Sequence, residues 1–127
     1  MCLAAAALVV ALTLTAAHAA DWPNAQLVTV VETDYRFEPA KLRLRVKVPY
    51  RLRLENRGSD FHEFTAPGFF RTVELRNPDA LNAERSQVAL QPGEQRDVYF
   101  IPRETGTYSF TCADHDWAGM SGEIVVE

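Results

Sequence analysis

Residues 20–127 contain few side chains of the kinds that bind soft metals or form disulfides: one cysteine, two histidines and one methionine. With one cysteine, this part of the chain forms no internal disulfide. Basic residues are not in excess either, because 13 Lys and Arg stand against 17 Asp and Glu, which does not favour nucleic-acid binding. No stretch shows sustained helical periodicity, and no repeat or linker divides the chain.

Charge is absent from the first twenty residues. A run of Ala, Leu, Val and Thr covers residues 3–17 and is followed by Ala17-His18-Ala19, which fits a small-x-small cleavage site. We therefore predict a signal peptide over residues 1–19 and one domain over residues 20–127, in a periplasmic or otherwise exported protein. Because the segment lacks Lys and Arg before its apolar run, an uncleaved N-terminal anchor is the alternative.

Alternation of apolar and charged residues predicts strands along the remainder of the chain. The clearest case is 41–48, where Leu and Val alternate with Lys and Arg. Further strands are expected over 26–33, 51–55, 61–65, 87–90, 95–101, 106–112 and 122–127, separated by turn residues. Residues 77–85 are expected to form a helical turn or two. This pattern predicts an all-β fold, a Greek-key antiparallel β-sandwich of seven or eight strands.

Three of the four scarce residues lie together near the C-terminus, as Cys112, His115 and Met120 in a C-x2-H-x4-M run. The second histidine, His62, lies fifty residues upstream. Each residue alone has an ordinary explanation: the cysteine as a small buried side chain, a histidine as a polar surface residue, and the methionine as a core residue. A thiolate, two imidazoles and a thioether together are the ligand set of a copper electron-transfer site. In an exported protein, a single thiol is also protected when it binds a metal.

Strand alternation indicates how these residues could meet. It places Tyr108, Phe110 and Cys112 on one face of the 106–112 strand, so that Cys112 points inward at the strand end. The following loop would then bring His115 and Met120 back towards Cys112, with Gly119 and Gly122 allowing it to turn tightly. His62 would come from a neighbouring strand.

The stretch 106–126 resembles the copper loop of cupredoxins, and its C-x2-H-x4-M spacing is similar to that of plastocyanin and pseudoazurin. Upstream segments resemble the small bacterial periplasmic cupredoxins of the EfeO-like type, in the same order along the chain. These segments are Tyr35-Arg36-Phe37-Glu38-Pro39, residues 51–56, His62-Glu63-Phe64 and Gln91-Pro92-Gly93-Glu94.

The resemblance implies one copper per chain, alternating between Cu(I) and Cu(II), with His62, Cys112 and His115 as strong ligands and Met120 as the axial ligand. It also implies that electrons leave through His115. Where the family commonly has Asn after the first histidine, this chain has Glu63. Three roles are open for Glu63: a hydrogen-bonding group beside the site, a solvated strand residue, or an additional ligand.

Two surfaces are candidates for contact with partners. Trp117 lies between His115 and Met120, and an exposed aromatic there would help a redox partner dock; packing of Trp117 against the loop is the alternative. Residues 67–70, Pro-Gly-Phe-Phe, are expected at the same end of the molecule, either as part of an exposed apolar patch or with Phe69 packed against the loop. The second surface is basic and is expected to be either a solvated sheet face or a surface that steers an acidic partner or anionic lipid. Its residues are Lys41, Arg43, Arg45, Lys47, Arg51 and Arg53.

The sequence thus predicts an exported mononuclear type 1 copper protein that carries single electrons between periplasmic redox partners. We do not expect an enzyme, because four protein ligands leave no open metal position for substrate and no Ser-His-Asp or paired-carboxylate pattern is present. Alternatives are a copper-binding or delivery protein in metal homeostasis and an accessory domain of a metal-uptake system. No nucleic-acid partner is expected, and membrane contact is expected only if the N-terminal segment stays uncleaved.

Overall fold

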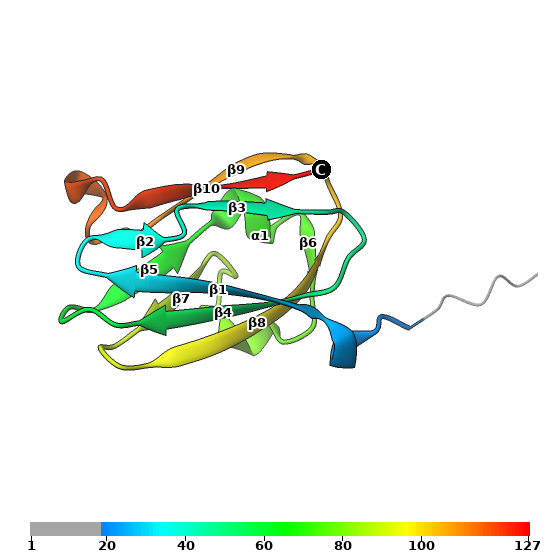
Figure 1. Ribbon diagram of the computed structural model, residues 1–127, viewed down its shortest axis with the longest axis horizontal. Helices are drawn as coiled ribbons and strands as arrows, with labels where there is room; N and C mark the ends of the chain where they lie inside the picture. The colour runs from blue at the N-terminus through cyan, green and yellow to red at the C-terminus, as the bar shows by residue number, and fades with distance from the viewer. Residues whose placement is uncertain (1–18) are drawn as a thin grey trace, which may run out of the picture.

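The chain forms ten strands in two five-stranded sheets that pack face to face (Figure 1). The computed structural model describes residues 19–127. The first sheet has the order β2 (Arg36–Glu38), β1 (Gln26–Thr33), β4 (Tyr50–Asn56), β8 (Gln95–Pro102) and β6 (Val73–Leu75). The second has the order β3 (Lys41–Leu44), β10 (Ser121–Val126), β9 (Gly106–Thr111), β5 (His62–Thr65) and β7 (Gln87–Leu90).

The predicted β-sandwich is confirmed, with more strands and a different pairing from those expected. Both sheets are mixed, because β1 pairs with β4 and β10 pairs with β3 in parallel, while the remaining pairs are antiparallel. The additional strands, β2 and β6, have three residues each. Strands this short sit at sheet edges and show too few residues for alternation to be recognised.

The strand expected over 41–48 ends earlier, at Leu44. Lys47 adopts a left-handed backbone conformation with φ of 65°. The N–H of Val46 donates to the carbonyl of Glu127 and that of Lys47 to the carbonyl of Pro102. Val46 is still partly buried against the core, so the alternation predicted its burial correctly although it overestimated the length of the strand.

Short helices complete the fold. The region 77–85 contains a single 3-10 turn, Pro78–Ala80, consistent with the expected turn. A four-residue helix, α1 (Pro67–Phe70), buries Phe69 and Phe70 in the core. The expectation that 67–70 contributes an apolar surface beside the metal site is therefore wrong, because these two rings pack inward.

An aromatic cluster between the sheets positions the residues that follow it. The rings of Phe64 on β5 and Phe110 on β9 stack with centroids 4.6 Å apart, and Phe37 packs edge-on against both. Because side chains two residues apart in extended chain share a face, His62 on β5 and Cys112, directly after β9, continue outward from this stacked pair. The core thus dictates that these two side chains face each other.

Gly122 belongs to this packing and not to the loop turn that the sequence suggested. It lies in β10 opposite Phe110, and a Cβ there would fall on the Phe110 ring and 2.5 Å from the carbonyl oxygen of Ala40. Gly119, in contrast, has φ of 77° and ends the 3-10 turn η3 (Asp116–Ala118), as expected of a turn glycine.

Three connections meet at one end of the sandwich: the turn between β1 and β2, the loop between β4 and β5, and the loop between β9 and β10 (Figure 1). β1 begins near the opposite end, where the C-terminus also lies (Figure 1). The predicted signal peptide lies almost entirely outside the described residues. Within residues 19–127, no helix is long and apolar enough to cross a membrane.

The six basic residues do not form one surface. Lys41 and Arg43 lie on β3 of the second sheet, whereas Arg51 and Arg53 lie on β4 of the first. Four of the six pair with carboxylates: Lys41 with Glu123, Arg43 with Glu127, and both Arg51 and Arg53 with Asp97. This arrangement is that of solvated sheet faces, which was the simpler of the two expectations.

Candidate metal centre

The loop that carries three predicted ligands is closed by its own backbone. The N–H of Cys112 donates to the carbonyl of Met120 at 3.1 Å, so the residues at the two ends of the loop are bonded to each other. Inside this ring, the N–H of His115 donates to the carbonyl of Cys112 at 3.1 Å, and the N–H of Met120 donates to the carbonyl of His115. The short C-x2-H-x4-M spacing therefore folds into a compact turn, in which the Cys112 and His115 side chains approach each other.

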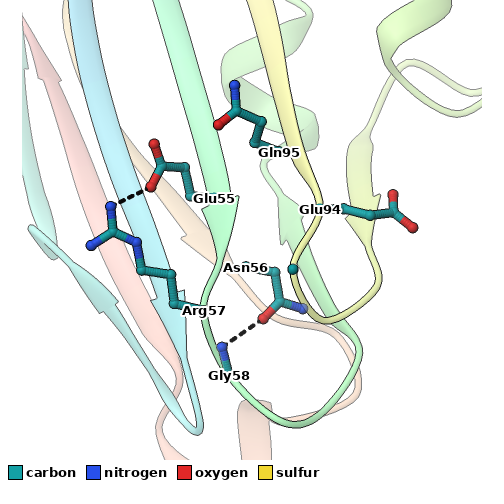
Figure 2. Close-up of a pocket in the computed structure, with 7 residues that line it drawn as sticks. Glu55, Asn56, Arg57, Gly58, Glu94 and Gln95 are labelled. Carbon is teal, nitrogen blue, oxygen red and sulfur yellow. Dashed lines mark hydrogen bonds and ion pairs between the residues drawn. The ribbon is translucent and has the colours of Figure 1, made fainter.

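His62 reaches these two side chains from β5, and Asn56 holds the loop that leads to it. The Asn56 amide donates to the carbonyls of Asp60 and Leu90. Its oxygen accepts the N–H of Gly58 (Figure 2). Leu90 is the residue that pairs with His62 across β5 and β7. One buried amide therefore links the end of β4, the following loop and the strand partner of His62. The pocket beside this loop is lined by Glu55 and Arg57, which pair with each other (Figure 2).

Three of the predicted ligands converge. The Sγ atom of Cys112 lies 3.3 Å from Nδ1 of His115 and 4.0 Å from Nδ1 of His62, and the three ligand atoms lie within 4.8 Å of one another. Donor atoms each about 2.0–2.3 Å from one metal ion in a trigonal arrangement lie roughly 3.5–4 Å apart. A thiol and two ring nitrogens with this spacing therefore fit a single copper ion.

Met120 is placed beside this cluster by the loop. It is fully buried, as are Cys112 and His62, and it is bonded through its backbone to both Cys112 and His115. Its role as an axial ligand remains a prediction. His115 differs from the other three, because 14% of its side chain is exposed. It is the predicted ligand at the surface.

The Cys112 thiol lies in an apolar but partly hydrogen-bonded environment. Burial raises its pKa, while backbone N–H groups, among them that of Glu63 at 3.4 Å, act in the opposite direction by stabilising the thiolate. A bound metal ion removes the proton, because the thiolate is the form that coordinates. The Glu63 N–H is therefore already aimed at the negative charge that metal binding would create.

Glu63 contacts the site through its backbone. Its side chain is buried and its pKa is raised, by burial first and then by the charge of Asp114. Among the described residues, the cluster of possible ligand atoms contains His62, Cys112 and His115 and does not include the Glu63 carboxylate. Of the three roles left open by the sequence, the geometry fits a residue beside the site.

The outer nitrogens of both histidines face carboxylates. Nε2 of His62 is 2.7 Å from Oδ1 of Asp34, and Nε2 of His115 is 3.9 Å from Oδ2 of Asp60. Asp34 has its pKa lowered to about 2, first by the hydrogen bond from the N–H of Ser59 and then by that from His62. It is therefore ionised at neutral pH and accepts hydrogen bonds only.

Aromatic rings cover the surface side of the site. The Tyr35 ring lies 4.9 Å from that of His115 and 6.1 Å from that of Trp117. Its hydroxyl donates to Asp60, which raises the Tyr35 pKa. Trp117 is 77% exposed and Tyr35 is 41% exposed. Sequence reasoning identified Trp117 but assigned no role to Tyr35 or Asp34, which reach the site through the turn after β1.

Comparison with known proteins decides the family. The model of the cupredoxin-like domain matches residues 4–126. The chain belongs to the cupredoxin-like family. For this cupredoxin-like domain, the family and the cluster of two histidines and one cysteine together support one copper per chain. No curated protein sequence matches the chain significantly.

Solved structures agree on the fold of this cupredoxin-like domain. Auracyanin B is 24% identical with a TM-score of 0.59, over 81% of this chain and 89% of its own. Dithionite-reduced auracyanin from Roseiflexus castenholzii is 16% identical with a TM-score of 0.62, and the match covers 81% of this chain and 98% of that auracyanin. A multi-copper oxidase from Pediococcus acidilactici is 18% identical with a TM-score of 0.63, over 88% of this chain but 28% of its own.

Proposed function

We propose that this cupredoxin-like domain is an exported type 1 copper protein that carries single electrons between redox partners. His62, Cys112 and His115 hold the copper as strong ligands, and Met120 is the axial ligand. The observation that carries the proposal is the convergence of one thiol and two Nδ1 atoms, from elements fifty residues apart, within 4.8 Å. A copper ion in such a site supplies one-electron chemistry between Cu(I) and Cu(II).

The surrounding residues suit a site that changes little during electron transfer. Cys112 and His62 lie two residues along the chain from the stacked Phe110 and Phe64 rings, and the loop is bonded end to end. A set of ligands held in one geometry needs little rearrangement when the charge of the bound ion changes. Burial of these ligands also excludes water from the thiolate.

Burial favours an electron carrier over a copper-delivery protein. His62, Cys112 and Met120 are fully buried, and His115 is the only one of the four predicted ligands with measurable exposure, at 14% of its side chain. An acceptor protein could approach the site only over the His115 edge, beneath Tyr35 and Trp117. We therefore expect slow release of copper to other molecules and fast movement of electrons.

The redox partner docks, in this proposal, over the face around His115. Trp117 and Tyr35 supply exposed apolar rings there, and Asp60, Asp114 and Asp116 supply exposed carboxylates around them. Apolar contact permits a short-lived complex, and the carboxylates favour a partner with a basic rim. Electrons would pass through the partly exposed His115 ring.

Repeated redox cycling in the presence of a Cu(I) chelator tests this function. The purified protein is loaded with one equivalent of Cu(II), reduced, reoxidised and reduced again, and the chelator complex is measured after each cycle. An electron carrier retains its copper through many cycles. Rapid transfer of copper to the chelator on first reduction would contradict the proposal and would favour copper delivery. His115→Ala, which removes the partly exposed ligand, is the positive control for copper loss and should release copper faster than the wild type.

A further inference from the structure

The carboxylate of Asp34 is the hydrogen-bond acceptor for three groups at the edge of the site. It accepts the N–H of Ser59 at 2.8 Å, the N–H of Asp60 at 3.2 Å, and a bond from Nε2 of His62 at 2.7 Å. The first two bonds come from the loop between β4 and β5, whereas the third comes from a predicted metal ligand. Asp34 itself follows the end of β1, so it joins a turn of the first sheet to a strand of the second.

This contact determines which nitrogen of His62 carries the proton. An ionised carboxylate has no hydrogen to donate, so the bond requires the hydrogen to be on Nε2 of the imidazole. The neutral ring then has its lone pair on Nδ1, which is the nitrogen that faces Cys112 at 4.0 Å. The fold thus sets both the orientation and the tautomer of His62 that metal binding needs.

The backbone is built to admit this pair. A Cβ on Gly58 would overlap Oδ1 of Asp34 and would lie 2.8 Å from Nε2 of His62. Gly58 is held at this place by its N–H, which donates to the Asn56 side chain (Figure 2). Any side chain larger than a hydrogen atom at this position would push Asp34 and His62 apart.

The two histidines are unequal in this respect. His115 has its Nε2 3.9 Å from Asp60, beyond hydrogen-bonding distance, and Asp60 instead accepts the Tyr35 hydroxyl. A metal-bound histidine that donates to a carboxylate becomes a more basic ligand, and loss of such a partner typically weakens metal binding about 10–100-fold. His62 has such a carboxylate partner, whereas His115 does not.

We propose that Asp34 is a positioning residue for the copper site: it fixes the Nε2–H tautomer of His62, and its negative charge makes the site favour Cu(II) over Cu(I). The second part rests on the proposed function, since it needs copper at His62. The charge effect has a simple cause, because a more electron-rich imidazole and a nearby anion both stabilise the more highly charged ion. Asp34 therefore lowers the reduction potential of the site.

The first experiment uses the metal-free protein, so it does not depend on the proposed function. Long-range ¹H–¹⁵N correlation spectra report the His62 tautomer in the wild type, Asp34→Asn and Asp34→Ala. We expect the Nε2–H form in the wild type and in Asp34→Asn, whose amide oxygen can still accept the bond, and a mixture of tautomers in Asp34→Ala. An unchanged Nε2–H form in Asp34→Ala would overturn the positioning role.

The second experiment measures the charge effect on the copper-loaded protein. Competition with chelators gives the dissociation constants for Cu(II) and Cu(I) in the wild type and in Asp34→Asn. We expect the preference for Cu(II) to fall about tenfold in the variant, which corresponds to a rise of about 59 mV in the one-electron potential. The matched control is Asp116→Asn, which removes an exposed carboxylate of the same face that is not bonded to either histidine. An equal shift in both variants would overturn the charge effect.

Gly58→Ala provides an independent variant in which Asp34 keeps its charge. Because the added methyl group separates the pair, the metal-free protein should show the tautomer mixture of Asp34→Ala. A wild-type protein that binds no copper through Cys112 would contradict the proposed function but would leave the tautomer result to decide the positioning role.

Discussion

Glu32 is a carboxyl group in the core, and its ionisation should make stability fall as pH rises. It lies on β1 with Val28 and Val30 on the inward face, is fully buried, and both of its carboxyl oxygens lack a hydrogen-bond partner. Burial raises its pKa from 4.5 to about 8, with a further contribution from the charge of Glu63. Glu32 is therefore protonated in the folded protein at neutral pH.

The sign of the effect follows from the two pKa values. Below pH 4.5 the group is protonated in both states and favours neither. Between pH 4.5 and about 8 the unfolded chain has lost the proton while the folded protein keeps it, so rising pH favours unfolding. The free energy of unfolding should fall by about 1.4 kcal/mol per pH unit over this window from Glu32 alone, and level off above it.

The perturbation is Glu32→Gln, which has nearly the same shape and does not ionise. Urea unfolding of the metal-free, reduced protein at pH 5, 6 and 7 gives the free energy of unfolding for wild type and variant. Between pH 5 and 7, the free energy of unfolding of the variant should rise by roughly 2–3 kcal/mol relative to that of the wild type. Effects of the histidines and of Cys112 are common to both proteins and cancel in this difference.

Glu84→Gln is the matched control, because Glu84 is an exposed glutamate of the same chain. Its pH dependence should run parallel to that of the wild type. Parallel curves for the wild type and Glu32→Gln would show that Glu32 is not held protonated in the core and would refute this reasoning.

Three further substitutions test other parts of the structure. Gly122→Ala should lower the free energy of unfolding by about 1–3 kcal/mol, because the new methyl group meets the Phe110 ring; denaturant unfolding measures this. Asn56→Ala removes three hydrogen bonds of a buried amide and should lower the free energy of unfolding by about 2–4 kcal/mol in the same assay. A decrease below about 1 kcal/mol would contradict the role of Asn56 in linking these segments. Trp117→Ala should change stability by less than about 0.5 kcal/mol. In stopped-flow measurements it should slow electron exchange with a protein partner but not with a small inorganic reagent, and equal slowing of both would contradict a docking role.

The ligand cluster could be predicted because it depends on local spacing and on scarce residue types. Cys112 and His115 are separated by two residues, and strand alternation already placed Cys112 on the same face as Phe110. His62 was the only other histidine in residues 20–127. The structure adds the reason for the position of His62, which is the stacking of Phe64, two residues further along β5, on Phe110.

The groups around the ligands could not be predicted because they depend on long-range packing. Asp34 reaches His62 across twenty-eight residues, and a charged residue at a strand end is usually solvated. Glu32 could have been found, since alternation places it on the same face as Val28 and Val30. The basic residues of 41–53 were assigned to one surface because alternation gives the face of each strand but not the sheet to which it belongs.

The visible absorption spectrum after addition of one equivalent of Cu(II), measured for the wild type and Cys112→Ser, tests the central claim most directly. If His62, Cys112 and His115 hold the copper, the wild type should show an intense sulfur-to-copper charge-transfer band towards the red end, and the variant should lack it. A pale wild-type solution with only weak copper bands would show that Cys112 is not a Cu(II) ligand and would contradict the electron-transfer site.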